Sequence, residues 1–174
     1  MIAGPLDLGY IAFYGVGAYV YALLASPQFN LHLPFWAILP LGALTACLFG
    51  VLLGAPTLKL RGDYLAIVTL GFGEIIRVVI LNVNAIGGSR GFSGIPQLSN
   101  FFWVYLVVLV TIVTVYNLVN SSYGRAFISI RDDEIAAEAM GVDTTRFKVL
   151  SFVISSMFAG IAGGLFGHFT MFLH

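Results

Sequence analysis

Apolar residues occur along this chain in five long segments that are separated by more polar stretches. Each segment has close to the ~20 residues that an α-helix needs to cross the hydrocarbon core of a membrane. The pattern predicts an all-α, polytopic bundle of about five transmembrane helices, over residues 9–26, 34–55, 64–83, 101–119 and 149–173. The first segment is the shortest and is rich in glycine, so a broken or partial span is an alternative there.

The composition excludes a soluble domain. Hydrophobic residues make up 59% of the 174 residues and charged residues only 9%, against roughly 25% charged in an ordinary globular domain. So few charges cannot cover the surface of a soluble protein of this size, whereas lipid tails solvate apolar side chains. We therefore predict a single transmembrane domain over residues 1–174, in contact with membrane lipid. The formal net charge of zero gives no reason to expect a nucleic-acid partner.

Basic residues mark one side of the predicted membrane domain. Six lie in alternate loops and one, Arg90, lies in a loop on the opposite side, with Arg77 set aside because it falls inside a segment. Lys and Arg concentrate in the cytoplasmic loops of membrane proteins. The distribution predicts that the N-terminus is inside. The six residues predicted on the inner side are Lys59, Arg61, Arg125, Arg131, Arg146 and Lys148.

The inner loop over residues 120–148 contains four basic and five acidic residues. Within it, residues 132–140 have the composition of a short amphipathic helix, whose acidic first turn complements the helix dipole. Gly141 is placed to follow the C-terminus of this helix, and Asp143 or Thr144 to cap the next one. Without other information, the pattern is also typical of a solvated juxtamembrane helix that has no partner. We expect apolar contacts of this helix from Ile135, Ala139 and Met140.

Glu74 and Arg77 stand inside the third segment, three residues apart, so they share a helix face and can pair. Ionisable groups are costly in a membrane, and they usually face a protein interior or a water-filled path. Two interpretations are open. The pair lines or shapes a translocation path, or it is a buried structural pair that fixes helix packing or anchors the outer end of the span.

Small residues recur at a spacing of four in two segments, as Gly50 with Gly54 and Gly160 with Gly164. This spacing allows two membrane helices to cross closely, because no side chain holds the backbones apart. The pattern predicts helix packing rather than chemistry.

No pattern in the chain indicates catalysis, a cofactor or a metal. There is no Gly-x-x-x-x-Gly-Lys-Ser/Thr loop, so ATP-driven transport would need a separate ATPase subunit. His32, His168 and His174 match no metal-ligand spacing, and the serines lack a partner base and acid. Cys47 lies in an apolar run and is interpreted as a packing residue. We therefore predict a protein that is not an enzyme.

Three stretches together resemble the permeases of branched-chain amino acid ABC transporters of the LivM type. They occur in the family's order and cover most of the chain. The first is residues 6–19, LDLGYIAFYGVGAY, and the second is residues 56–77, PTLKLRGDYLAIVTLGFGEIIR. The third is residues 124–141, GRAFISIRDDEIAAEAMG, followed by Lys148.

The resemblance implies the membrane-spanning subunit of an ATP-driven importer of leucine, isoleucine, valine or similar small solutes. Its partners would be a second permease subunit that completes a heterodimeric pore, two ABC ATPase subunits and an external solute-binding protein. The implied location is the bacterial inner membrane, crossed several times. Members of the family are longer, with spans before and after the matched region, so the chain is expected to correspond to a fragment of a permease.

The resemblance also implies a role for the inner loop. ABC importers present a short "EAA" helix to a cleft on the ATPase subunit. Here Ala136, Ala137 and Gly141 keep the Ala-Ala-x-x-x-Gly spacing, and Glu134 is displaced by one residue from the usual Glu-Ala-Ala pattern. The residues of this implied ATPase-coupling helix are Asp132, Asp133, Glu134, Ala136, Ala137, Glu138 and Gly141.

A secondary transporter or channel that uses Glu74 and Arg77 in an ion path is the alternative function. Such a protein would have polar residues on several spans, and here only the third segment has a charged pair. A membrane-embedded enzyme is a third class, and it would need a catalytic constellation that the sequence does not contain. Binding of the helix over residues 132–141 to an ATPase subunit would discriminate between the first two classes.

Overall fold

A computed structural model describes residues 10–25, 35–57, 63–83, 92–93, 100–170 and 172–173. In these residues the chain forms α1 (Tyr10–Ala25), α2 (Phe35–Thr57), α3 (Asp63–Asn82), α4 (Phe101–Asn120), α5 (Ser122–Asp132), α6 (Glu134–Ala139) and α7 (Thr144–Thr170). Two short strands, β1 (Phe92–Ser93) and β2 (Phe172–Leu173), pair antiparallel, with Phe92 opposite Leu173 and Ser93 opposite Phe172. The prediction of an all-α membrane helix bundle is confirmed.

Each of the five predicted apolar segments contains a long helix. Among the described residues, α4 and α7 are both long enough and apolar enough to cross a membrane, and α1 and Ala37–Leu52 of α2 are shorter apolar helices. The helix α1 is unbroken over its 16 residues, which gives a length of about 24 Å at ~1.5 Å per residue. That is less than the ~30 Å of a typical hydrocarbon core.

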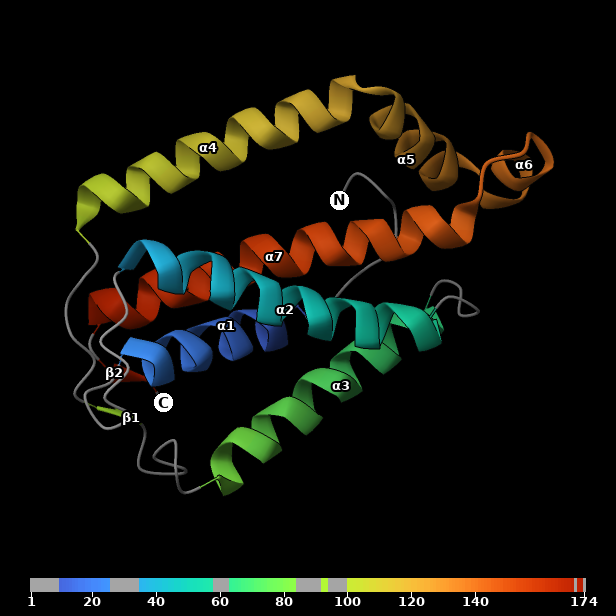
Figure 1. Cartoon of the computed structure of the whole chain (residues 1–174). Helices are drawn as coiled ribbons and strands as arrows, with labels where there is room; N and C mark the ends of the chain where they lie inside the picture. The colour runs from blue at the N-terminus through green and yellow to red at the C-terminus, as the bar shows by residue number, and fades with distance from the viewer. Residues whose placement is uncertain are drawn as a thin grey trace.

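The helices α1, α2 and α7 form the packed centre of the molecule, and Figure 1 shows α7 running alongside both of the others. Glycines allow this close approach. A Cβ atom on Gly17 of α1 would overlap the backbone of Gly160 of α7, and a Cβ on Gly50 of α2 would overlap the side chain of Ser156. The prediction that the glycines at positions 50 and 160 mark helix crossings is confirmed.

Two long helices stand at the sides of this centre. Figure 1 shows α4 apart from α1, α2 and α7 over most of its length. No residue of α4 is buried, and its first residue, Phe101, packs its ring on Phe169 of α7 at a centroid distance of 5.3 Å. On the other side, α3 packs on α1 through the rings of Phe72 and Phe13, 6.3 Å apart. Both helices expose large apolar side chains, as lipid contact allows.

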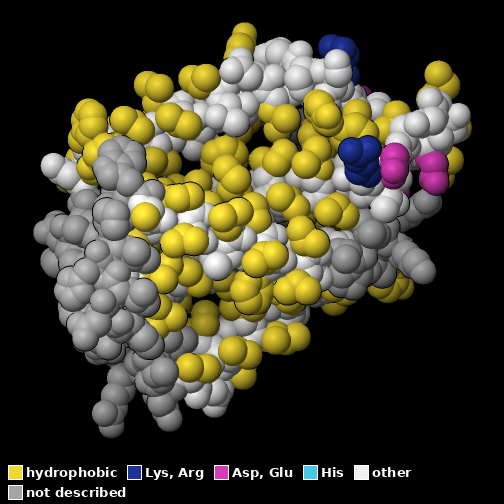
Figure 2. Space-filling model, in the orientation of Figure 1, with side chains coloured by type: hydrophobic (Ala, Val, Ile, Leu, Met, Phe, Trp, Pro, Cys, Tyr) yellow, Lys and Arg dark blue, Asp and Glu magenta, His cyan; other side chains and the backbone are white. Residues whose placement is uncertain are grey.

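Most of the charged side chains that the structure describes lie at one end of the molecule. Figure 2 shows the visible Lys, Arg, Asp and Glu side chains gathered near α5 and α6, while hydrophobic side chains cover the long helices. Arg125 and Arg131 lie in α5, and Arg146 and Lys148 lie in the first turns of α7. The basic residues at positions 59, 61 and 90 lie outside the described residues, so the predicted orientation, with the N-terminus inside, stays a prediction.

Candidate functional site

The charged end of the molecule is a compact hook built from α5, α6 and the start of α7. The hook begins where α4 ends at Asn120 and the chain turns at Ser121. The Ser121 hydroxyl oxygen accepts a hydrogen bond from the Gly124 amide at 3.3 Å and so caps α5. A Cβ on Gly124 would overlap the backbone of Val119, so this glycine permits the sharp turn from α4 into α5.

The helix α5 packs on α7 through aromatic rings. Its buried residues are Gly124, Phe127 and Ile130. The Phe127 ring meets the Phe147 ring of α7 edge-on at a centroid distance of 5.5 Å, and the Tyr123 ring lies 5.9 Å from the same Phe147 ring. The apolar face of α5 therefore packs on the N-terminal end of α7. The sequence pattern did not predict α5 as a separate helix.

Asp133 separates α5 from α6. Its backbone is extended, with φ −156°, and its carboxylate accepts hydrogen bonds from the amides of Ile135 and Ala136 at 2.9 and 3.0 Å. The prediction that one helix covers residues 132–140 is therefore wrong at its start, because Asp132 is the last residue of α5 and Asp133 is a cap. An Asp side chain in this position satisfies two amides that the first helical turn leaves without partners.

Gly141 terminates α6 as predicted. Its φ is +85°, a conformation that glycine adopts without steric cost. The Gly141 amide donates to the Glu138 carbonyl, and the Val142 amide donates to the Ala137 carbonyl, both at 3.0 Å. These two bonds form a Schellman motif, which closes the helix and reverses the chain. Asp143 then caps α7, since its carboxylate accepts from the Arg146 amide at 3.0 Å.

The apolar contacts of α6 differ from those predicted. Ile135 is 67% exposed and Met140 is 85% exposed, and Ala139 is exposed as well. Ala137 is the buried residue of this helix. Because the helix has only 6 residues, one small buried residue provides its contact with the rest of the hook. Its larger apolar side chains project outward. Ala136, Glu138, Asp132 and Asp133 are also exposed, so the hook presents a mixed apolar and acidic surface.

An ion pair joins α6 to α7. The Lys148 ammonium donates to Glu134 Oε1 at 2.7 Å, and the side chains of Lys148 and Glu134 are 7% and 24% exposed. Sequence reasoning placed Glu134 in the coupling helix but did not predict this partner. The two residues are 14 positions apart on different helices, and no helical spacing relates them. From the sequence alone, a lysine at the end of a membrane span is expected to be solvated. Only the fold of the hook brings Lys148 to Glu134.

Glu74 and Arg77 form an ion pair on α3, with Arg77 Nη1 and Glu74 Oε2 3.5 Å apart. The side chain of Glu74 is 59% exposed and that of Arg77 is 70% exposed. Within the described residues, this pair therefore lies on an outward face of α3 and is not buried between packed helices. Gly71, about one turn before Glu74, also faces open space, since a Cβ there would meet no atom within 4 Å.

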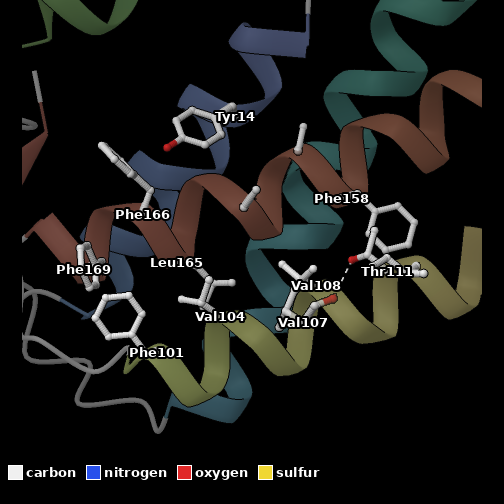
Figure 3. A pocket seen from close by; sticks show the side chains of 13 residues that line it. Tyr14, Phe101, Val104, Val107, Val108, Thr111, Phe158, Leu165, Phe166 and Phe169 are labelled. Atoms are coloured by element: carbon white, nitrogen blue, oxygen red, sulfur yellow. Dashed lines mark hydrogen bonds between the residues drawn. The ribbon is translucent and has the colours of Figure 1, made fainter. Parts of the chain in front are cut away.

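An apolar groove of about 640 Å³ runs between α4 and the packed centre. Figure 3 shows Phe101, Val104 and Val108 of α4 facing Leu165 and Phe169 of α7 across it. Thr111 and Tyr14 supply the polar groups of its lining, and the Thr111 hydroxyl donates to the Val107 carbonyl of its own helix at 2.8 Å. Among the described residues, the groove is lined by apolar side chains with these two hydroxyl groups and by no charged side chain, and such a lining does not compensate the two charged ends of an amino acid.

Comparison with known proteins relates the chain to one family. Residues 1–172 match the family described as "Branched-chain amino acid transport system / permease component". The high-affinity branched-chain amino acid transport system permease proteins LivM of Salmonella typhimurium and Escherichia coli are each 42% identical to it. Each match covers 95% of this chain and 46% of the relative. No solved structure matches the chain.

An archaeal relative shows the same relation in length. The probable branched-chain amino acid transport permease protein LivM of Methanocaldococcus jannaschii is 29% identical over 98% of this chain and 56% of its own length. The chain thus spans about half the length of the curated relatives that it matches.

Proposed function

Because the chain belongs to the family of branched-chain amino acid transport permease components, we propose that it forms part of the membrane-spanning subunit of an ABC importer. The observation that supports this proposal most strongly is the family match over nearly the whole chain, from residue 1 to residue 172. The proposed cargo is leucine, isoleucine, valine or a similar small solute, and the proposed location is the bacterial inner membrane. The subunit forms a pore and performs no covalent chemistry.

The proposed assembly has three further kinds of component. A second permease subunit completes the pore, two ATPase subunits bind and hydrolyse ATP on the cytoplasmic side, and an external solute-binding protein delivers the cargo. ATP binding closes the ATPase dimer, which moves the helices docked on it. The pore then alternates between outward-facing and inward-facing states, with each state stabilised by a different set of contacts.

We propose α6 as the helix that docks on the ATPase subunit. Three features of the hook support this role. The helix is fixed at both ends, by Asp133 and by the turn at Gly141. It projects from the charged end of the molecule, away from the apolar surfaces of α3 and α4 (Figure 2). Ile135 near its start and Met140 at its C-cap are exposed, and apolar side chains of this size stabilise an interface when a partner removes them from water.

We propose that the Glu74–Arg77 pair faces the translocation path or shapes its wall. Both side chains are exposed on α3 in this chain. A charged side chain at membrane depth is costly unless it faces water or polar groups of another element. A water-filled path beside this face of α3 would meet that requirement, and it would suit a cargo that has both a positive and a negative charge.

Replacing Glu74 with Gln tests this placement. We expect leucine uptake to fall by about tenfold, the effect of ~1.4 kcal/mol on a rate, because Arg77 loses the carboxylate that compensates its charge. The amount of assembled complex should not change. The double variant Glu74→Gln, Arg77→Gln is the matched control, since removing both partners of a purely structural pair leaves no uncompensated charge. Full uptake by the double variant would show that the pair is structural only.

The function itself is tested by uptake in a bacterium that lacks its own branched-chain amino acid import. The protein is expressed with its second permease, ATPase and binding-protein partners, and uptake of labelled leucine is measured. We expect uptake that disappears when the P-loop lysine of the ATPase subunit is replaced. Uptake that persists without a functional ATPase would contradict the proposal and would favour a secondary transporter.

A further inference from the structure

Within the hook, side chains of α5 and α6 pack on two neighbouring residues of α7. Phe147 receives the rings of Tyr123 and Phe127 from α5. Lys148 receives the carboxylate of Glu134 from α6. One attachment is apolar and tolerates sliding of the rings, whereas the other is a short ion pair with a defined geometry. The turn at Gly141 joins α6 to α7 along the chain, and the Glu134–Lys148 pair adds a side-chain contact that fixes the position of one helix on the other.

The surroundings of this ion pair favour a rigid link. Only 7% of the Lys148 side chain is exposed, and water screens a buried pair much less than a surface pair. A buried ammonium without an anionic partner is strongly disfavoured, so separation of the two side chains is costly. Glu134 is the first residue of α6, directly after the Asp133 cap, so the ion pair acts at the capped N-terminal end of the helix.

The two helices that flank the hook differ in their connection to the packed centre. The helix α7 crosses α1 and α2 at backbone distance, where Gly160 lies against Gly17 and Ala46. The helix α4 has no buried residue. A displacement of the hook would therefore reach α1 and α2 through α7, whereas α4 has little packing through which to transmit it.

We propose that the Glu134–Lys148 ion pair is a strut that makes α6 and α7 move as one body, so that motion of α6 is delivered to α7 and through it to α1 and α2. The role of the strut in transport rests on the proposed function, in which an ATPase subunit moves α6. Glu134 and Lys148 are positioning residues in this scheme, because neither needs to touch the cargo or the nucleotide.

The coupling role is tested in the assembled importer by measuring leucine uptake per ATP hydrolysed. We expect Glu134→Gln and Lys148→Met to reduce this ratio by about two- to thirtyfold, the range of couplings measured for residues that transmit motion between sites. ATP hydrolysis should continue in both variants. The exchanged variant, Glu134→Lys with Lys148→Glu, should recover most of the ratio because it restores the pair. Arg146→Met, which removes an exposed cation from the same end of α7, is the matched control.

A second measurement tests the strut without any ATPase. Spin labels at Met140 beside α6 and at Met157 in α7 report the distance between the two elements in the purified protein. We expect a narrow distance distribution in the native chain, a broad one in Glu134→Gln, and a narrow one again in the exchanged variant. Equal widths in all three, or an unchanged uptake ratio in the single variants, would overturn the proposal. A native chain that shows the narrow distribution but binds no ATPase would contradict the proposed function, but not the proposal that the ion pair holds α6 and α7 together.

Discussion

Replacing Gly17 with Leu is expected to destabilise the bundle more than any other single change considered for this chain. The Cβ atom of the new side chain would overlap the backbone oxygen and Cα of Gly160. Backbone atoms cannot rotate away, so α1 and α7 must separate, which costs about 3 kcal/mol or more. At roughly 2–4 °C per kcal/mol for a chain of this size, the midpoint of thermal unfolding in detergent should fall by about 6–12 °C.

Gly71→Leu is the matched control for this experiment. The substitution is identical and lies in another long helix of the bundle, but a Cβ on Gly71 meets no atom within 4 Å. We expect no loss of thermal stability from it, since leucine also forms helices more readily than glycine. If both variants melted at the native temperature, the close crossing of α1 and α7 would be contradicted.

Replacing Gly141 with Pro is expected to abolish docking on the ATPase. Proline fixes φ near −65°, whereas Gly141 has φ +85°, and proline also lacks the amide that donates to the Glu138 carbonyl. The turn that closes α6 cannot then form, at a cost of about 3 kcal/mol, which corresponds to about a hundredfold loss of affinity. Binding of purified ATPase subunits to the immobilised membrane protein measures this directly.

Two further variants show whether the loss comes from backbone geometry. Gly141→Asn keeps the amide, and asparagine adopts the left-handed conformation more readily than other residues with side chains, so we expect affinity close to native. Glu138→Arg keeps the backbone and reverses one exposed charge of α6, so it tests the surface of the helix alone. An unchanged affinity in Gly141→Pro would contradict the docking role of α6.

The features predicted correctly from the sequence are those that a few neighbouring residues determine. A run of about 20 apolar residues has one stable solution in a membrane, a helix, and so the five long helices were predictable. Gly141 and Asp143 were equally predictable, because helix caps depend on the residues within one turn. The glycines at positions 50 and 160 were also predictable as close crossings, because a residue without a side chain lets another helix approach its backbone, whichever helix that is.

The remaining features depend on contacts between residues far apart in the chain. The start of α6 was predicted two residues too early, at Asp132 rather than Glu134. Both Asp132 and Asp133 are good first-turn residues, and the sequence does not show that the backbone of Asp133 is extended and separates α5 from α6. Ile135 and Met140 point outward because of the way α6 packs on α7, and the composition of the segment does not determine that packing. The Glu134–Lys148 pair joins two helices across a reversal of the chain and has no signature in either helix alone.

The central claim, that α6 docks on an ATPase subunit, is tested most directly by site-specific photo-crosslinking in the assembled importer. A benzophenone amino acid replaces Met140, which is 85% exposed beside α6, or Tyr105, which is 71% exposed on α4. Both positions are open in the isolated chain, so accessibility alone does not favour either. We predict a crosslink from position 140 to the ATPase subunit and none from position 105. An importer that assembles but gives no crosslink from position 140, or gives equal crosslinking from both positions, would contradict the claim.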